Sequence, residues 1–127
     1  MQNHYEQIIR ELAPFEPVVI YHFGSSAKGQ THAGSDVDLA FYSRRPADPC
    51  KVFDAAQRIA ELVGRDVDLV DLHQVGDVLK VQVIHGGRRI FTGDVLAADT
   101  FEMLAFSGYA RLNEERKEIL QKQGFAL

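Results

Sequence analysis

Two aspartates separated by a single residue, Asp36 and Asp38, are the part of this sequence best suited to chemistry. They enter an apolar run, so we expect a strand over 36–42, in which alternate side chains share a face. The two carboxylates then lie side by side and repel each other unless a cation lies between them. Hard oxygen ligands of this kind favour magnesium or manganese. We therefore predict a divalent metal site at this pair.

A second acidic strand offers a third carboxylate. The run 66–72 is apolar and has aspartates at alternate positions. If it lies beside the strand at 36–42, either Asp68 or Asp66 can face the same cleft, and Asp68 is preferred because it is central in the run. Asp71 has the opposite parity and should point away. Three carboxylates holding one or two metals are typical of phosphoryl and nucleotidyl transfer, where they stabilise the attacking and leaving oxygens.

A Gly-Ser turn precedes the acidic pair. Gly24 and Ser25 follow the apolar run 18–23, which we expect to be a buried strand, and they open a short predicted helix over 25–32. Backbone amides at a helix start, together with a hydroxyl, can bind phosphate oxygens. Serine is also a common helix N-cap, and Ser25 can have both roles.

A P-loop is the rival interpretation of the same turn. The segment 24–31 follows a strand and imitates the P-loop spacing, but that motif needs a lysine directly after its second glycine. Here that residue is Gln30, and Lys28 comes two positions early. The sequence therefore favours the carboxylate-based site over a P-loop.

The pattern of Gly24-Ser25 followed about ten residues later by Ser35-Asp36-Val37-Asp38 resembles the signature of the nucleotidyltransferase superfamily that includes polymerase beta. The short chain and the segments 66–72 and 87–91 resemble its minimal (MNT) branch. The stretch 109–116 resembles MntA-type antitoxins, which are paired with HEPN-domain ribonuclease toxins. This resemblance implies a Mg²⁺-dependent adenylyltransferase that moves AMP from ATP to a hydroxyl, a toxin tyrosine, and so silences the RNase in a hetero-oligomer.

The resemblance also implies a role for each site residue. The catalytic and metal-binding group is Asp36, Asp38 and Asp68, with Asp68 also a candidate general base. The nucleotide-binding group is Gly24, Ser25, Lys28 and Ser35. Many relatives have an arginine directly after Gly-Ser, where this chain has Ser26. The residue that supports the leaving pyrophosphate therefore stays open among the basic candidates Lys28, Arg44, Arg45, Arg88 and Arg89.

Two other functions stay open. A non-catalytic antitoxin would bind and occlude its toxin around a vestigial nucleotide site. A small-molecule adenylyltransferase of the aminoglycoside type would need a further helical half, which a partner subunit would have to supply. We prefer the protein adenylyltransferase, because the three carboxylates and the Gly-Ser turn are all present.

Composition narrows the class of protein. The chain has 127 residues, a net charge of −4 and 46% hydrophobic residues, which is typical of a globular protein rather than a dedicated nucleic-acid binder. A lone cysteine excludes an internal disulfide and fits a reducing compartment. No apolar run approaches the roughly 18–20 residues of a membrane span, and the N-terminus lacks a secretion signal. We expect a cytoplasmic protein without direct nucleic-acid or membrane partners.

Alternating strands and helices predict an α/β (α+β) polymerase-beta-like fold, with a mixed sheet of about four strands flanked by helices. We expect a single domain over 1–127, with a core over about 18–91 and a long C-terminal helix over about 95–121 that Asp94 caps. Further helices are predicted over 4–13, 52–63 and 75–85, and a last strand over 88–91.

The C-terminal helix is expected to have a core-facing stripe and a second apolar patch. The stripe consists of Phe101, Leu104, Tyr109, Leu112 and Ile119. Met103 and Phe106 lie off that stripe. They are either covered by the rest of the protein or part of a protein interface.

Overall fold

Four strands form one mixed sheet in the computed structural model, which describes residues 4–27 and 36–124. The strands are β1 (Pro17–Phe23), β2 (Val37–Ser43), β3 (Val67–Asp71) and β4 (Arg88–Thr92), in the order β3-β2-β1-β4. β1 is antiparallel to both β2 and β4, whereas β2 and β3 are parallel. The predicted mixed sheet of about four strands is therefore confirmed.

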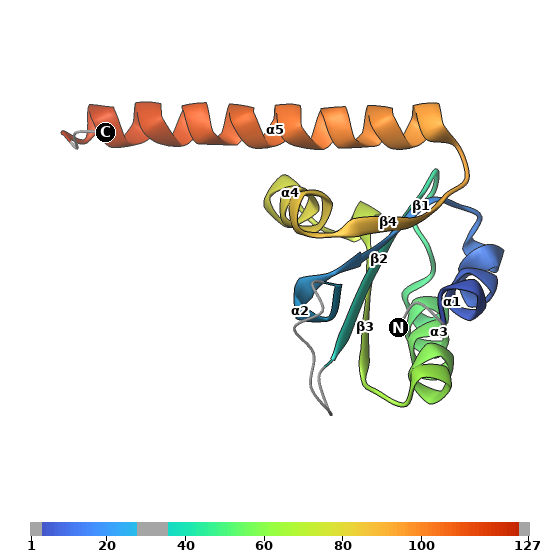
Figure 1. Cartoon of the computed structure of the whole chain (residues 1–127). Coiled ribbons are helices and arrows are strands. Elements are labelled where there is room, and N and C mark those ends of the chain that lie inside the picture. The colour runs from blue at the N-terminus through green and yellow to red at the C-terminus, as the bar shows by residue number, and fades with distance from the viewer. Residues whose placement is uncertain (1–3, 28–35, 125–127) are drawn as a thin grey trace.

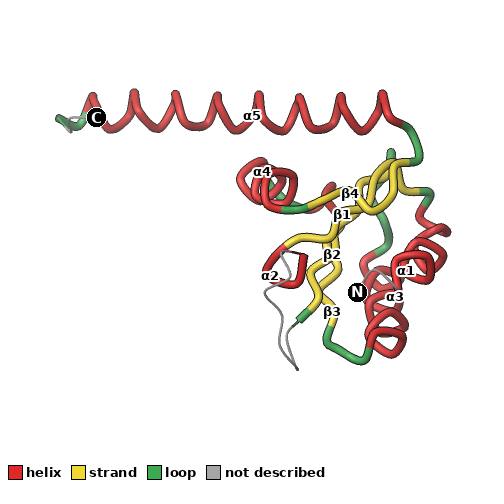
Figure 2. Tube along the Cα trace, viewed as in Figure 1, coloured by secondary structure: helices red, strands yellow, loops and turns green. Residues whose placement is uncertain are grey.

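Helices cover both faces of this sheet (Figure 1). One face packs against α1 (Tyr5–Leu12) and α3 (Pro49–Val63), and the other against α4 (Asp77–Gly86) and α5 (Val95–Lys122). The short α2 (Gly24–Ala27) directly follows β1 at the end of the sheet where β2 begins (Figure 2). Within residues 4–27 and 36–124, no helix is both long enough and apolar enough to cross a membrane.

Alternation along β2 decides which face each side chain meets. Val37, Leu39 and Phe41 are fully buried against α1 and α3. Ala40 is fully buried in the second cluster, with Tyr21 of β1 and residues of α4 and α5. Because side chains alternate along a strand, Asp38 lies on the same face as Ala40. The apolar pattern thus places the acidic residue on the α4/α5 face.

Helix α3 begins earlier than its apolar pattern predicts. The sequence pattern predicts a start at position 52, which is wrong. Pro49 is the first helical residue, where its missing N–H costs nothing, and the Asp48 carboxylate accepts a hydrogen bond from the Cys50 N–H. The predicted end is confirmed, because Gly64 closes the helix at a φ of 70°.

Helix α5 begins as predicted but packs differently. Asp94 caps it by accepting a hydrogen bond from the Ala97 N–H, and the helix of 28 residues is about 42 Å long. The predicted core stripe is wrong at Leu104, Leu112 and Ile119, because Leu104 and Ile119 are 60% and 56% exposed and Leu112 is also exposed. Tyr109 of the same stripe is half-buried. The sheet is too short to cover such a helix, so its C-terminal half projects beyond the sheet (Figure 1).

The buried face of α5 is made of small residues and one aromatic. Ala98, Phe101 and Ala105 are the buried residues of this helix. Met103 and Phe106 are both exposed, so the described part of the chain leaves much of each side chain uncovered. Their part in a protein interface stays a prediction.

Candidate active site

Strand register brings two of the predicted carboxylates together. Asp38 lies directly opposite Asp68 in the parallel pair of β2 and β3, so the two side chains project from the same face of the sheet. Asp36 lies immediately before β2 and is exposed. The two strands are neighbours, which was the condition for a shared cleft, and the register selects Asp68 as the residue beside Asp38.

Asp38 has two carboxylates near it. Burial raises the pKa of Asp38, and the negative charges of Asp68 and Asp36 raise it further. Like charges gathered in this way favour a cation between them, and carboxylate oxygens suit Mg²⁺. In the described ranges no group of three His, Cys, Asp or Glu side chains is arranged to hold a metal by itself. Mg²⁺ ordinarily takes only one or two carboxylates and completes its shell with water and substrate phosphates, so the donor set fits this ion.

Gly24 allows the carboxylate of Asp38 to approach the Gly-Ser turn. Its φ is +77°, and a Cβ built on it would lie 2.2 Å from Oδ2 of Asp38. The carboxylate therefore fills the space that any side chain at position 24 would occupy. Phe23, the preceding residue, pairs with Asp38 across β1 and β2. Turn and carboxylate thus form one structural unit, which the sequence motif did not by itself show.

The other predicted nucleotide-binding residues are only partly visible. The backbone of Ser25 belongs to α2, but its side chain lies outside what the structure describes, as do Lys28 and Ser35. The predicted helix over 25–32 is described only as far as Ala27. The roles assigned to these residues stay predictions.

The arginines that were candidates for phosphate binding are distributed over the whole molecule. Arg44, with Arg45 beside it, follows the far end of β2, and Arg44 pairs with Asp94. Arg89 binds Asp99 and Glu102 of α5. Arg88 donates a hydrogen bond of 2.8 Å to the carbonyl of Ala27, the last residue of α2. Among the four arginines, the structure therefore holds Arg88 beside the Gly-Ser turn.

The remaining aspartates of the acidic strand have other surroundings. Asp71 is buried and accepts hydrogen bonds from the N–H groups of Ala47 and His73, at 2.8 and 3.0 Å. It lies on the face opposite Asp68, as its parity predicted. Asp66 is exposed and precedes β3, and its backbone carbonyl accepts a hydrogen bond from the N–H of Val37. Because Asp68 and not Asp66 lies opposite Asp38, Asp66 is the weaker candidate for the third carboxylate.

Comparison with known proteins points to nucleotidyl transfer. Residues 6–95 match the family described as polymerase beta, nucleotidyltransferase. The protein adenylyltransferase MntA of Shewanella oneidensis is 32% identical over 119 residues, which cover 94% of this chain and 84% of that protein.

Two solved structures are similar over nearly the whole chain. One is a toxin–antitoxin with AMP-PNP, with a TM-score of 0.81, 31% identity, and coverage of 95% of this chain and 98% of that chain. The other is a tri-AMPylated Shewanella oneidensis HEPN toxin in complex with MNT antitoxin, with a TM-score of 0.79, 29% identity, and coverage of 98% and 100%. Coverage of this extent includes α5 as well as the sheet.

Proposed function

Because this chain belongs to the polymerase beta nucleotidyltransferase family, we propose that it is a protein adenylyltransferase that transfers AMP from ATP to a HEPN-type toxin and thereby neutralises it. The observation that carries the proposal is Asp38 opposite Asp68, with its carboxylate against Gly24 at the Gly-Ser turn. The similarity to MntA and to the complex of a tri-AMPylated HEPN toxin supports the acceptor class. A tyrosine hydroxyl of the toxin is the proposed acceptor.

The carboxylates would hold Mg²⁺ at the start of β2. Asp38 and Asp68 share a face of the sheet, and burial first, then the negative charges of Asp68 and Asp36, raise the pKa of Asp38. Asp36 adds a third carboxylate at the exposed edge. When bound, Mg²⁺ neutralises phosphate charge and aligns the attacking and leaving oxygens.

The protein groups would orient the nucleotide and move one proton. Gly24 and Ser25 would bind the β- and γ-phosphates, assisted by Lys28 and Ser35. Asp68 would accept the proton of the toxin hydroxyl. The hydroxyl oxygen would then form a bond to the α-phosphorus as the bond from that phosphorus to pyrophosphate breaks.

We further propose that this ATP-dependent reaction takes place in the cytoplasm.

Arg88 would keep the phosphate-binding turn in place. It reaches from β4 to the carbonyl of Ala27 and so fixes the end of α2 against the sheet. This contact would position Gly24 and Ser25 without requiring Arg88 to touch the nucleotide. Correct placement of reacting groups is a large part of the catalysis expected in phosphoryl transfer.

The deciding experiment is intact-mass spectrometry of the cognate toxin after incubation with this protein and Mg-ATP. We expect adenylyl-sized mass increments on the toxin. Asp38→Asn and Asp68→Asn should reduce the rate by at least about 100-fold, because each removes a charge that the transition state needs. Asp66→Asn is the matched control, and it should change the rate less than roughly threefold.

Different outcomes separate the possible functions. An unmodified toxin that is nevertheless bound and inactive would indicate occlusion and would contradict the proposal. A full loss of activity in Asp66→Asn, with an active Asp68→Asn variant, would move the third carboxylate to position 66. Chelation of Mg²⁺ with EDTA should abolish the transfer. Added Mn²⁺ should restore it, because Mn²⁺, like Mg²⁺, accepts oxygen ligands.

A further inference from the structure

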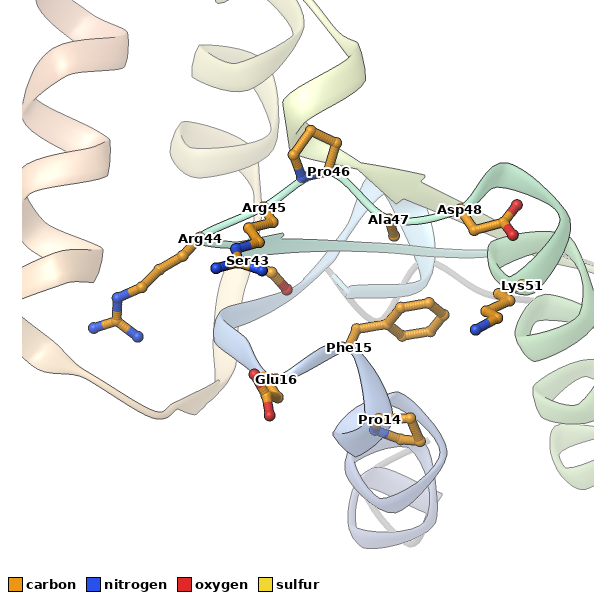
Figure 3. Close-up of a pocket in the computed structure, with 10 residues that line it drawn as sticks. All are labelled: Pro14, Phe15, Glu16, Ser43, Arg44, Arg45, Pro46, Ala47, Asp48 and Lys51. Carbon is orange, nitrogen blue, oxygen red and sulfur yellow. The ribbon is translucent and has the colours of Figure 1, made fainter.

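A cavity of about 510 Å³ lies at the end of β2 that is remote from Asp38. Figure 3 shows the residues that line it. The residues of its wall that matter here are Phe15, Glu16, Ser43, Arg45 and Lys51. Its volume falls within the range of small-molecule sites in proteins. Nothing in the proposed transfer reaction uses it.

The cavity is separate from the active site in two ways. Ser43 and Asp38 lie on the same strand but five residues apart, which corresponds to about 17 Å along an extended chain. Odd-numbered β2 residues such as Phe41 pack toward α1 and α3, whereas Asp38 belongs to the other face. A ligand in the cavity would therefore lie beyond the reach of the carboxylates.

Ser43 supplies a buried hydroxyl without a partner. The residue is 4% exposed, and among the described residues its Oγ has no hydrogen-bond partner. The backbone carbonyl of Ser43 accepts a hydrogen bond from Nε2 of His73, which holds this part of the chain in place. A buried polar group left unpaired costs about 1–3 kcal/mol. A ligand oxygen at the cavity wall would remove that cost.

Two cations without ion-pair partners lie at the same cavity. Arg45 and Lys51 are exposed, and neither makes an ion pair within the described part of the chain. The neighbouring Arg44, in contrast, is paired with Asp94. Of the acidic residues in the wall, Asp48 caps α3 through the Cys50 N–H, and Glu16 is the other carboxylate. The wall thus has three basic and two acidic side chains, whereas the whole chain has a net charge of −4.

An aromatic ring and two prolines form the apolar part of the wall. Phe15 stacks on Phe41 with ring centroids 5.0 Å apart, which fixes its orientation. Pro14 and Pro46 complete this part of the wall, and Figure 3 shows Phe15 between Ser43 and Lys51. We propose that the cavity binds a small phosphomonoester, with the phosphate on Ser43, Arg45 and Lys51 and an apolar or aromatic body against Phe15. Guanidinium, ammonium and hydroxyl donors together suit phosphate oxygens.

The test uses the full chain and phenyl phosphate as the probe, followed by amide chemical shifts in NMR titrations. We expect saturable shifts at Ser43, Arg45 and Lys51, with the amides of Asp38 and Asp68 unaffected. Phenyl phosphate should bind more tightly than inorganic phosphate, which lacks the ring, and more tightly than phenol, which lacks the charge.

Variants separate a built site from a generally basic surface. The Arg45→Gln/Lys51→Gln variant should weaken phenyl phosphate binding roughly tenfold, because it removes two charge-assisted donors. Arg58→Gln is the matched control, because Arg58 also lies on α3 but pairs with Glu11 outside the cavity, and it should leave binding unchanged. Ser43→Ala should weaken binding and raise the melting temperature of the free protein, since it removes a buried hydroxyl that has no partner among the described residues.

Three results would overturn the proposal. They are shifts confined to the carboxylate end of the sheet, equal binding of phenyl phosphate and phenol, and unchanged affinity in the double variant. Activity of the protein toward a toxin does not enter this test. Failure here would therefore leave the proposed adenylyl transfer untouched.

Discussion

At the scale of single residues, Gly24 is subject to two separate constraints. Its φ of +77° favours glycine, and Oδ2 of Asp38 occupies the place of a side chain. Gly24→Ala should therefore lower the free energy of unfolding by about 1–2 kcal/mol and displace Asp38. Because misplaced reacting groups cost on the order of 100-fold in rate, we expect a loss of that size in toxin modification, measured by mass spectrometry.

Gly64 provides the matched control for this substitution. It has a similar φ of +70°, yet a Cβ at this position would meet no atom within 4 Å. Gly64→Ala should lose stability through the same backbone strain, about 1 kcal/mol, and keep its activity. Equal activities of the two alanine variants would show that the contact between Gly24 and Asp38 is unimportant.

His22 makes the stability of the fold depend on pH. It is buried, and Nδ1 lies 2.6 Å from the hydroxyl of Tyr5. Burial first, and the charge of Arg88 second, lower the pKa of His22 from 6.5 to about 4. The unfolded chain therefore binds more protons than the folded protein between these two pH values, and stability rises with pH in that window.

We accordingly expect the contribution of His22 to be complete above pH 6.5 and to disappear as the pH falls toward 4. The loss should be roughly 3 kcal/mol, because each unit of the pKa difference between 6.5 and about 4 corresponds to about 1.4 kcal/mol. Urea unfolding at a series of pH values measures this loss. A His22→Phe variant should flatten this dependence. His85→Gln, at an exposed histidine, should retain it, and a wild-type protein without a pH slope in this window would contradict the assignment.

At the scale of elements, a polar network attaches α5 to the sheet. The hydroxyl of Tyr21 on β1 donates a hydrogen bond of 2.6 Å to Oε2 of Glu102, and Arg89 of β4 donates to the same oxygen. Burial, and then the hydrogen bond to Glu102, raise the pKa of Tyr21 well above its usual range. The Tyr21 hydroxyl therefore stays protonated and donates this hydrogen bond at neutral pH. The bond fixes the position of α5 relative to β1.

Removing the two partners of this bond should have unequal effects. Tyr21→Phe should cost about 1 kcal/mol, because Glu102 keeps Arg89. Glu102→Ala should cost about 2 kcal/mol, since the buried hydroxyl of Tyr21 is then left unpaired. Urea unfolding measures both, with Glu115→Ala on the projecting half of α5 as a control within about 0.5 kcal/mol of wild type. Equal losses at Tyr21 and Glu102 would argue against the network.

At the scale of the whole molecule, the projecting half of α5 should contribute little to folding. Beyond Ala105 the described residues of this helix are half-buried or exposed. Deletion of residues 110–127 should change the free energy of unfolding by less than roughly 1 kcal/mol, measured by urea unfolding. Deletion from Phe101 onward also removes the buried Phe101 and Ala105, and it should unfold the protein. If deletion of residues 110–127 also unfolded the protein, this division of α5 would be contradicted.

The sequence by itself determined the features that depend on local period and local chemistry. The alternation of β2 gave the face of Asp38, and parity separated Asp68 from Asp71. The cap at Asp94 and the end of α3 at Gly64 were also predictable, because capping involves only residues within one helical turn.

Only the tertiary structure decided the features that join distant parts of the chain. The register that sets Asp38 opposite Asp68, the approach of Asp38 to Gly24, and the bond from Tyr21 to Glu102 across 81 positions have no local signal. The exposure of the outer half of α5 likewise depends on where the sheet ends. The spacing of apolar residues along a helix or strand shows which of its faces is apolar. It contains no information on the length or position of the surface that packs against that face.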